Sequence, residues 1–230
     1  KVFTYDEALP LFKKGMEWYN AAKEYYVLDG FVSEHVSILE DMSWMYRMLA
    51  FWEKSPQRAL AMHKRRAGFL EPVVEQINPR AYDTLWKQVT FELGEIYREM
   101  MDIKLHSVYS IDEEYMPEKD LDSARRINEY GTKGIKYYIL FITSFKDQTG
   151  NIPDPVPPEN EHLFLSAKFY MARIYSRQAA LTREQAVQGL KQALDLYRWL
   201  VAYHSRNKTK VFLDEIEVCK QMEVLLPLRI

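Results

Sequence analysis

Hydrophobic residues recur along most of this chain at intervals of three and four positions, which places them on one face of an α-helix. The clearest stretch runs from Met62 to Lys104 and contains two such helices, separated by a break at Asn78-Pro79. Asn is a favourable N-cap and proline is tolerated at the first helical position, so we expect the second helix to begin at Pro79. The apolar face of that helix is wide enough to contact neighbours on two sides, and its members are Tyr82, Leu85, Trp86, Val89, Leu93, Ile96, Tyr97 and Met100.

The same periodicity, together with start and stop signals, predicts eight helices and no strand. Their expected ranges are about 6–28, 32–54, 57–76, 79–104, 120–146, 162–180, 183–205 and 210–226. Capping-box spacing at Thr4–Glu7 and Thr182–Gln185 marks two of the starts. Pro72 is expected to kink the third helix or end it early. Two longer loops remain, residues 105–119 and 147–161, and the second contains four prolines.

Short breaks between long helices favour antiparallel neighbours. A weak internal repeat points the same way, because Phe91-x-x-Gly94-x-Ile96-Tyr97 is similar to Phe169-x-x-Ala172-x-Ile174-Tyr175. The helices are longer than the tetratricopeptide repeat of about 34 residues allows. We therefore expect an all-α fold, a right-handed α-solenoid of antiparallel helix pairs that is tetratricopeptide-like with long helices. It should form a single domain over residues 1–230, with loops 105–119 and 147–161 within it.

Composition narrows the class of protein. Apolar residues make up 47% of the 230 residues and charged residues 28%, as in globular rather than disordered chains. The net charge of −2 argues against nucleic acid as a main ligand. The longest apolar run, residues 137–142, is far shorter than the roughly 20 residues of a membrane span, so we expect no membrane insertion. The first residue is Lys1, so we expect a piece of a longer protein.

The sequence offers little for catalysis, cofactor binding or metal binding. Glu159-x-x-His162 has the spacing found in di-iron bundles, but those sites need two such motifs and further glutamates, so an enzyme of that class stays a minor alternative. Cys219 is the single cysteine, which excludes an intrachain disulfide and suits a reducing compartment. It occupies an apolar-periodic position, so we expect a buried, inert thiol. We expect no catalytic residue, no cofactor and no metal ion, and hence no enzyme.

A basic run, His63-Lys64-Arg65-Arg66, lies inside the first helix of the opening stretch. Four consecutive helical residues cannot share one face, so the run does not form a continuous patch. We favour a solvated helix face with one residue turned inward. A partner-binding or localisation role is the alternative.

The loop 105–119 carries an acidic segment that we interpret as the partner-binding site. Between Asp112 and Asp120 there are five carboxylates against one lysine, interleaved with Tyr115 and Met116. Loops of this length are often functional or disordered, and an acidic one would steer a basic partner electrostatically. An ordinary polar loop is the alternative. The predicted contact residues are Asp112, Glu113, Glu114, Tyr115 and Glu118.

Short stretches along essentially the whole chain resemble the C-terminal part of the KIF-binding protein family, the kinesin-binding proteins. The stretches MHKRR, LEP and NP occur in that order, which makes the resemblance specific. The matching stretches are LDGFV (28–32), MLAFWE (48–53), MHKRR (62–66), LEP (70–72), NP (78–79), MMDIK (100–104), KYY (136–138), AKF (167–169), AR (172–173) and LLP (225–227).

The resemblance implies an α-solenoid that acts as a non-enzymatic regulator. It implies binding to kinesin motor domains that prevents their attachment to microtubules, with effects on cytoplasmic cargo and mitochondrial transport and on neuronal development. It also implies a cytoplasmic, cytoskeleton-associated location and specifies no oligomeric state. The alternative is a generic tetratricopeptide-like scaffold that binds an extended peptide in its groove.

Overall fold

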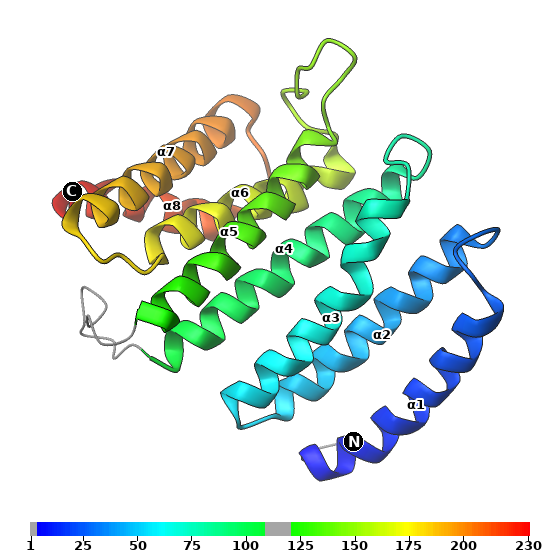
Figure 1. Cartoon of the computed structure of the whole chain (residues 1–230). Helices are drawn as coiled ribbons and strands as arrows, with labels where there is room; N and C mark the ends of the chain where they lie inside the picture. The colour runs from blue at the N-terminus through cyan, green and yellow to red at the C-terminus, as the bar shows by residue number, and fades with distance from the viewer. Residues whose placement is uncertain (1–3, 109–120) are drawn as a thin grey trace. The chain divides into compact units, whose positions relative to one another are not determined.

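The structure is a computed structural model that describes residues 4–108 and 121–230. Within these ranges every regular element is a helix, which confirms the all-α fold class (Figure 1). The helices are α1 (Tyr5–Tyr25), α2 (Val32–Trp52), α3 (Pro56–Gln76), α4 (Asp83–His106), α5 (Leu121–Thr143), α6 (Pro158–Arg177), α7 (Arg183–Asn207), α8 (Leu213–Leu225) and the short 3-10 helix η2 (Leu226–Leu228). None of these helices is both long and apolar enough to cross a membrane.

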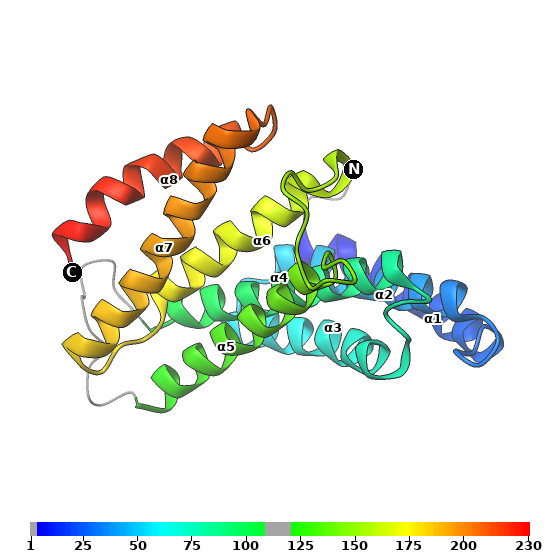
Figure 2. The ribbon, with the colours of Figure 1, turned by 90° about the horizontal axis from the view of Figure 1, so that it is seen from above.

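The chain divides into two compact units: unit 1 is Lys1–Ser107 and unit 2 is Val108–Ile230. In unit 1, helices α1 to α4 pack in chain order, each against the next (Figures 1 and 2). In unit 2, α5 packs on α6, α6 on α7 and α7 on α8. Successive helices in each unit run antiparallel, as the short breaks in the sequence predicted. A single domain over residues 1–230 stays a prediction.

The core of unit 1 lies between α2, α3 and α4. Its fully buried apolar side chains come from all three helices, and they include Val36, Met42, Leu70, Val89, Leu93, Ile96 and Met100. Helix α1 contributes no buried residue and covers α2 through an edge-to-face contact of Phe12 with Tyr46. The other face of α1 exposes Leu11, Trp18 and Tyr25, which recur every seven residues and therefore form one row.

The core of unit 2 is rich in aromatic side chains, which fill wide helix–helix seams. Its fully buried aromatic residues are Tyr138, Phe141, Phe164, Tyr197 and Tyr203. Small residues let α6 and α7 approach closely. A Cβ added at Gly189 of α7 would lie 2.6 Å from the carbonyl oxygen of Tyr175, and Ala172 of the internal repeat is fully buried.

The expected start of the fourth helix at Pro79 is wrong. Asn78 does not cap a helix, because its side-chain oxygen accepts a hydrogen bond from the amide of Arg80, and its carbonyl oxygen accepts from Ala81 and Tyr82. These bonds close a turn, and α4 begins four residues later at Asp83. An Asn-Pro pair is compatible with a turn as well as with a helix start, because in both the Asn side-chain oxygen can accept a hydrogen bond from a nearby backbone amide.

Pro72 does not end α3, which continues to Gln76 as its expected range did. One other proline expectation needs correction. The loop expected at 147–161 is shorter at its C-terminal end, because α6 begins at Pro158 rather than at His162. Proline fits the first turn of a helix because its missing N–H would have no partner there. The caps at Thr4 and Thr182 are confirmed, since each hydroxyl accepts from the backbone amide three residues on.

Candidate partner-binding site

The predicted contact residues Asp112, Glu113, Glu114, Tyr115 and Glu118 lie outside the residues that the structure describes. What the structure does describe is α4, the helix that leads directly into this segment. The last turn of α4 is closed by Ser107, whose hydroxyl donates to the carbonyl of Lys104 at 2.7 Å. The position of this helix end depends on how α4 is held against α2 and α3, and a buried charged side chain takes part in that contact.

The side chain at the centre is Arg66, from the basic run of α3. Arg66 is fully buried and His63 is 5% exposed, whereas Lys64 and Arg65 face solvent. Residues three apart on a helix share a face, so His63 and Arg66 turn inward together. The expectation of one inward residue in a solvated run is therefore corrected to two.

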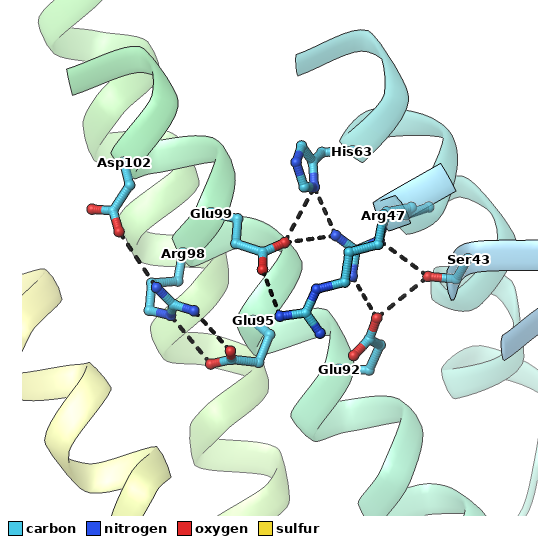
Figure 3. Close-up of polar contacts among 9 residues, drawn as sticks. Ser43, Arg47, His63, Glu92, Glu95, Arg98, Glu99 and Asp102 are labelled. Atoms are coloured by element: carbon cyan, nitrogen blue, oxygen red, sulfur yellow. Dashed lines mark hydrogen bonds and ion pairs between the residues drawn. The ribbon is translucent and has the colours of Figure 1, made fainter. Parts of the chain in front are cut away.

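Arg66 binds residues of three helices, and its partners Ser43, His63, Glu92 and Glu99 are labelled in Figure 3. Its guanidinium donates to Glu92 at 2.5 Å and to Glu99 at 2.6 Å, both on α4. Its Nε donates to the hydroxyl of Ser43 on α2 at 3.3 Å, and that hydroxyl donates onward to Glu92. Arginine suits such a position because its planar fork can bind several acceptors while remaining charged. We call Ser43, Arg47, His63, Arg66, Glu92 and Glu99 the Arg66 network.

His63 completes the network as a neutral acceptor. Its Nδ1 lies 2.8 Å from Nη1 of Arg66 and 3.3 Å from a carboxylate oxygen of Glu99. Burial, and then the charge of Arg66, lower its pKa to about 4, although Glu99 acts in the opposite direction. A neutral His63 accepts a hydrogen bond at Nδ1 from Nη1 of Arg66, so its approach to Glu99 is not an ion pair at neutral pH.

The charges of the network balance. Glu99 also pairs with Arg47 of α2 at 3.0 Å, so two guanidinium groups face two carboxylates. Burial opposes ionisation of Glu99, but Arg66 and Arg47 outweigh it and lower its pKa. A third carboxyl group, Glu40 of α2, has no such compensation. Burial, with the charges of Glu92 and Asp41, raises the pKa of Glu40 to about 7.

Other residues of α4 make further polar contacts. The hydroxyl of Tyr97 donates to Glu71 of α3 at 2.7 Å. Arg98 pairs with Glu95 at 2.7 Å and with Asp102 at 3.4 Å, all on α4 itself (Figure 3). The contacts of Glu92, Tyr97 and Glu99 with α3 therefore hold α4 in place over about two turns. Burying paired charges adds little net stability, because the cost of removing their water offsets their mutual attraction.

The residues considered for metal or thiol chemistry lie on α6 and α8 of unit 2. Glu159 and His162 lie in the first turns of α6, where the His162 ring contacts Phe212 at 5.6 Å. Residues 4–108 and 121–230 contain no group of three potential metal ligands. Cys219 is fully buried, as predicted, and burial raises the pKa of its thiol to about 12.

Sequence reasoning missed the acidic half of the Arg66 network. One signal was present, because Glu92 and Glu99 are seven residues apart on α4 and so share a face beside its apolar stripe. The partner of that face could not be read from the pattern, since it depends on which helix packs there.

Comparison with known proteins decides the family. The family model described as KIF-1 binding protein C terminal matches residues 1–230. The chain belongs to the KIF-binding protein family. The KIF-binding protein of Xenopus tropicalis is 33% identical over 227 residues, which cover 98% of this chain and 36% of the relative. The human KIF-binding protein is 30% identical over 225 residues, which cover 97% of this chain and 35% of the relative.

This member of the family spans about a third of the length of those relatives. Among solved structures, a de novo designed helical repeat protein aligns with 98% of the chain at 15% identity and a TM-score of 0.37. That likeness is too weak to assign a superhelical geometry.

Proposed function

We propose that this chain is a non-enzymatic module that binds kinesin motor domains and prevents their attachment to microtubules. The observation that carries the proposal is the match of the KIF-binding protein family over residues 1–230. With motor binding would come a cytoplasmic, cytoskeleton-associated location. Effects on cargo and mitochondrial transport and on neuronal development would follow from the same activity.

The mechanism that we propose is electrostatic competition. A motor surface that grips acidic microtubules must be basic, and the segment from Asp112 to Asp120 presents five carboxylates against one lysine. Opposite charges on two partners raise the rate of encounter and fix their orientation. The Arg66 network supports this role indirectly, because it holds α4, and α4 leads into the acidic segment.

The test is a binding titration with a purified kinesin motor domain. The chain and a variant with Asp112, Glu113 and Glu114 changed to lysine are compared at two salt concentrations. We expect the variant to bind at least tenfold more weakly, and its affinity to depend less on salt, because surface charge pairs are screened by ions. Pelleting with microtubules then checks whether the bound chain keeps the motor in the supernatant.

A matched control has the same change in net charge elsewhere. Glu24, Glu129 and Asp195 are exposed, lie on α1, α5 and α7, and form no ion pair among the described residues. Changing them to lysine should leave the affinity within about twofold of the unmodified chain. Equal losses in both variants would show a net-charge effect only and remove the acidic segment from the mechanism.

The alternative is a scaffold that binds an extended peptide in a groove between helices. It predicts that unstructured peptides bind as well as the folded motor domain. Binding by the peptides alone would favour this alternative over motor-domain recognition.

A further inference from the structure

Unit 2 contains a small cavity. It is formed where the loop before α6 packs on α6 and α7, and its volume is about 220 Å³. Phe164 and Trp199 provide its aromatic walls, Val156 and Tyr203 line it from the loop and from α7, and Lys168 of α6 lies among them. The cavity reaches the surface at Asp154, whose side chain is 47% exposed.

Hydrogen bonds fix the walls in place. The backbone amide of Val156 donates to the hydroxyl of Tyr203 at 3.1 Å, and that hydroxyl donates to Glu161 at 3.0 Å. The rings of Trp199 and Tyr203 stack with centroids 5.1 Å apart. The loop is thus attached to α7, so the cavity is formed before any ligand enters.

The ammonium group of Lys168 lies on the aromatic walls. Its Nζ is 4.1 Å from the ring centroid of Trp199 and 5.6 Å from that of Phe164. These distances are within the range of a cation–π interaction, which favours the charged form. Burial acts the other way and lowers the pKa of Lys168.

No carboxylate in the described part of the chain pairs with Lys168. Asp154 lines the same cavity and Glu161 accepts from its wall residue Tyr203, and both carboxylates are engaged by other groups. Asp154 accepts from Asn207 at 2.6 Å and from Arg206 at 3.0 Å. Glu161 accepts from Tyr203 through one oxygen and from Thr209 through the other. A half-buried ammonium therefore lacks the counter-charge that such groups usually have.

We propose that this cavity binds a carboxylate carried on a small apolar group, with the carboxylate on Lys168 and the apolar group between Phe164, Trp199 and Val156. The size supports a ligand of this class. Pockets for drug-sized ligands measure roughly 300–1,000 Å³, so a cavity of about 220 Å³ fits a single ring or one apolar side chain. Such a carboxylate could be a free small acid or the C-terminus of a peptide with an apolar last residue.

The experiment uses the position of Trp199, which is the single tryptophan of unit 2 among five in the chain. The chain is labelled with 5-fluorotryptophan, and the Trp199→Phe variant assigns the fluorine resonance. We expect 3-phenylpropanoate to shift this resonance saturably, with a Kd on the order of millimolar, and to leave the other four unchanged. The matched neutral probe, 3-phenylpropanol, should shift it at least tenfold less at equal concentration.

Two variants isolate the charge of Lys168. Lys168→Met keeps an unbranched apolar stem and should weaken 3-phenylpropanoate binding at least tenfold. Lys168→Arg keeps the charge and should retain binding within about threefold. Because the second variant conserves the cation, its binding shows that a loss in the first is due to charge rather than to altered folding.

A second arm distinguishes the source of the carboxylate. An acetylated Gly-Gly-Phe tripeptide with a free C-terminus is compared with its C-terminal amide. Tighter binding of the free-acid peptide than of 3-phenylpropanoate identifies a peptide terminus as the ligand, and the reverse order identifies a small acid. The proposal is overturned if neither carboxylate shifts the Trp199 resonance, if the neutral probes shift it equally, or if Lys168→Met binds as the unmodified chain does.

Discussion

Replacing Arg66 with methionine should destabilise unit 1 by about 3 kcal/mol at neutral pH. Methionine follows the arginine stem as far as Nε and carries no charge, so the change removes the charged head of the side chain and keeps its apolar stem. Four contacts are lost, to Ser43, His63, Glu92 and Glu99. The expected effect comes mainly from the two carboxylates that remain on α4.

The magnitude follows from the surroundings of those carboxylates. Removing one partner of a buried ion pair costs about 3–5 kcal/mol, because the other charge stays buried without compensation. Here the side chains of Glu92 and Glu99 are 24% and 19% exposed, so water can partly replace Arg66. Glu99 also keeps Arg47 at 3.0 Å. Both facts place the expected value at the lower end of the range.

Urea unfolding followed by tryptophan fluorescence measures the effect, because four of the five tryptophans lie in unit 1. With a slope of about 1.5 kcal/mol per molar urea, 3 kcal/mol moves the midpoint by about 2 M. Arg65→Met, on the exposed side of the same helix turn, should change the free energy of unfolding by no more than about 0.5 kcal/mol.

A second substitution separates the charge effect from packing. Arg66→Met combined with Glu92→Gln removes the carboxylate that loses its cation, and it should recover at least about 1 kcal/mol. A loss below about 1 kcal/mol for Arg66→Met alone, or no recovery in the double variant, would refute the view that Arg66 compensates buried carboxylates.

Three further predictions concern pH and backbone packing. Because the pKa of Glu40 is raised from 4.5 to about 7 in the folded chain, the free energy of unfolding should fall as the pH rises from about 5 to about 8. Glu40→Gln should remove this fall, which we place at about 1–2 kcal/mol after allowing for solvent screening. Because the pKa of His63 is lowered from 6.5 to about 4, stability should be lost as the pH falls from about 6.5 to about 4, and His63→Asn, which keeps an acceptor for Arg66, should abolish that loss. Finally, Gly68→Ala should stabilise α3 by about 0.5–1 kcal/mol, since a Cβ there meets nothing within 4 Å, whereas Gly189→Ala should destabilise unit 2 by about 1–3 kcal/mol.

Urea titrations at several pH values test the first two predictions. The two groups act in opposite directions between about pH 4.5 and 6.5, so each single variant should reveal the slope of the other group. Parallel pH profiles for all three chains would contradict both assignments. Thermal unfolding compares the glycine variants, and equal shifts in both would show that the close approach at Gly189 is not the cause.

Helical periodicity predicted the number, type and order of the α-helices, because the apolar stripe of each helix is the face that packs against the core. The clearest errors fall at two prolines. Pro79 lies in a turn before a helix rather than at its start, and Pro158 begins a helix expected to start at His162. Proline restricts its own φ and removes a donor, but both are compatible with a turn, a first helical turn or a locally broken hydrogen bond. Tertiary contacts choose between these outcomes.

For the candidate site too, the sequence shows which residues share a helix face but not which faces meet. The spacing of His63 and Arg66 indicates that charged residues of the basic run share a face, and the spacing of Glu92 and Glu99 indicates the same for α4. That these faces meet follows only from the packing of α3 on α4. Lys168 gives only part of its surroundings locally. Phe164 lies four residues earlier on the same helix, but Trp199 lies on the next helix and the cavity is closed by a loop.

The Arg66 network also bears on how long unit 1 stays folded. The bonds of Arg66 to Ser43, Glu92 and Glu99 join residues 23 to 33 positions apart, so the helices that carry them can meet quickly during folding. We expect these bonds to form after the folding transition state, because the charges lose their water only once α2, α3 and α4 have all docked. Interactions formed that late slow unfolding and leave the folding rate unchanged. The network should therefore slow the unfolding of unit 1. In Arg66→Met, nearly the whole loss of stability should appear as a faster unfolding rate, with the folding rate unchanged.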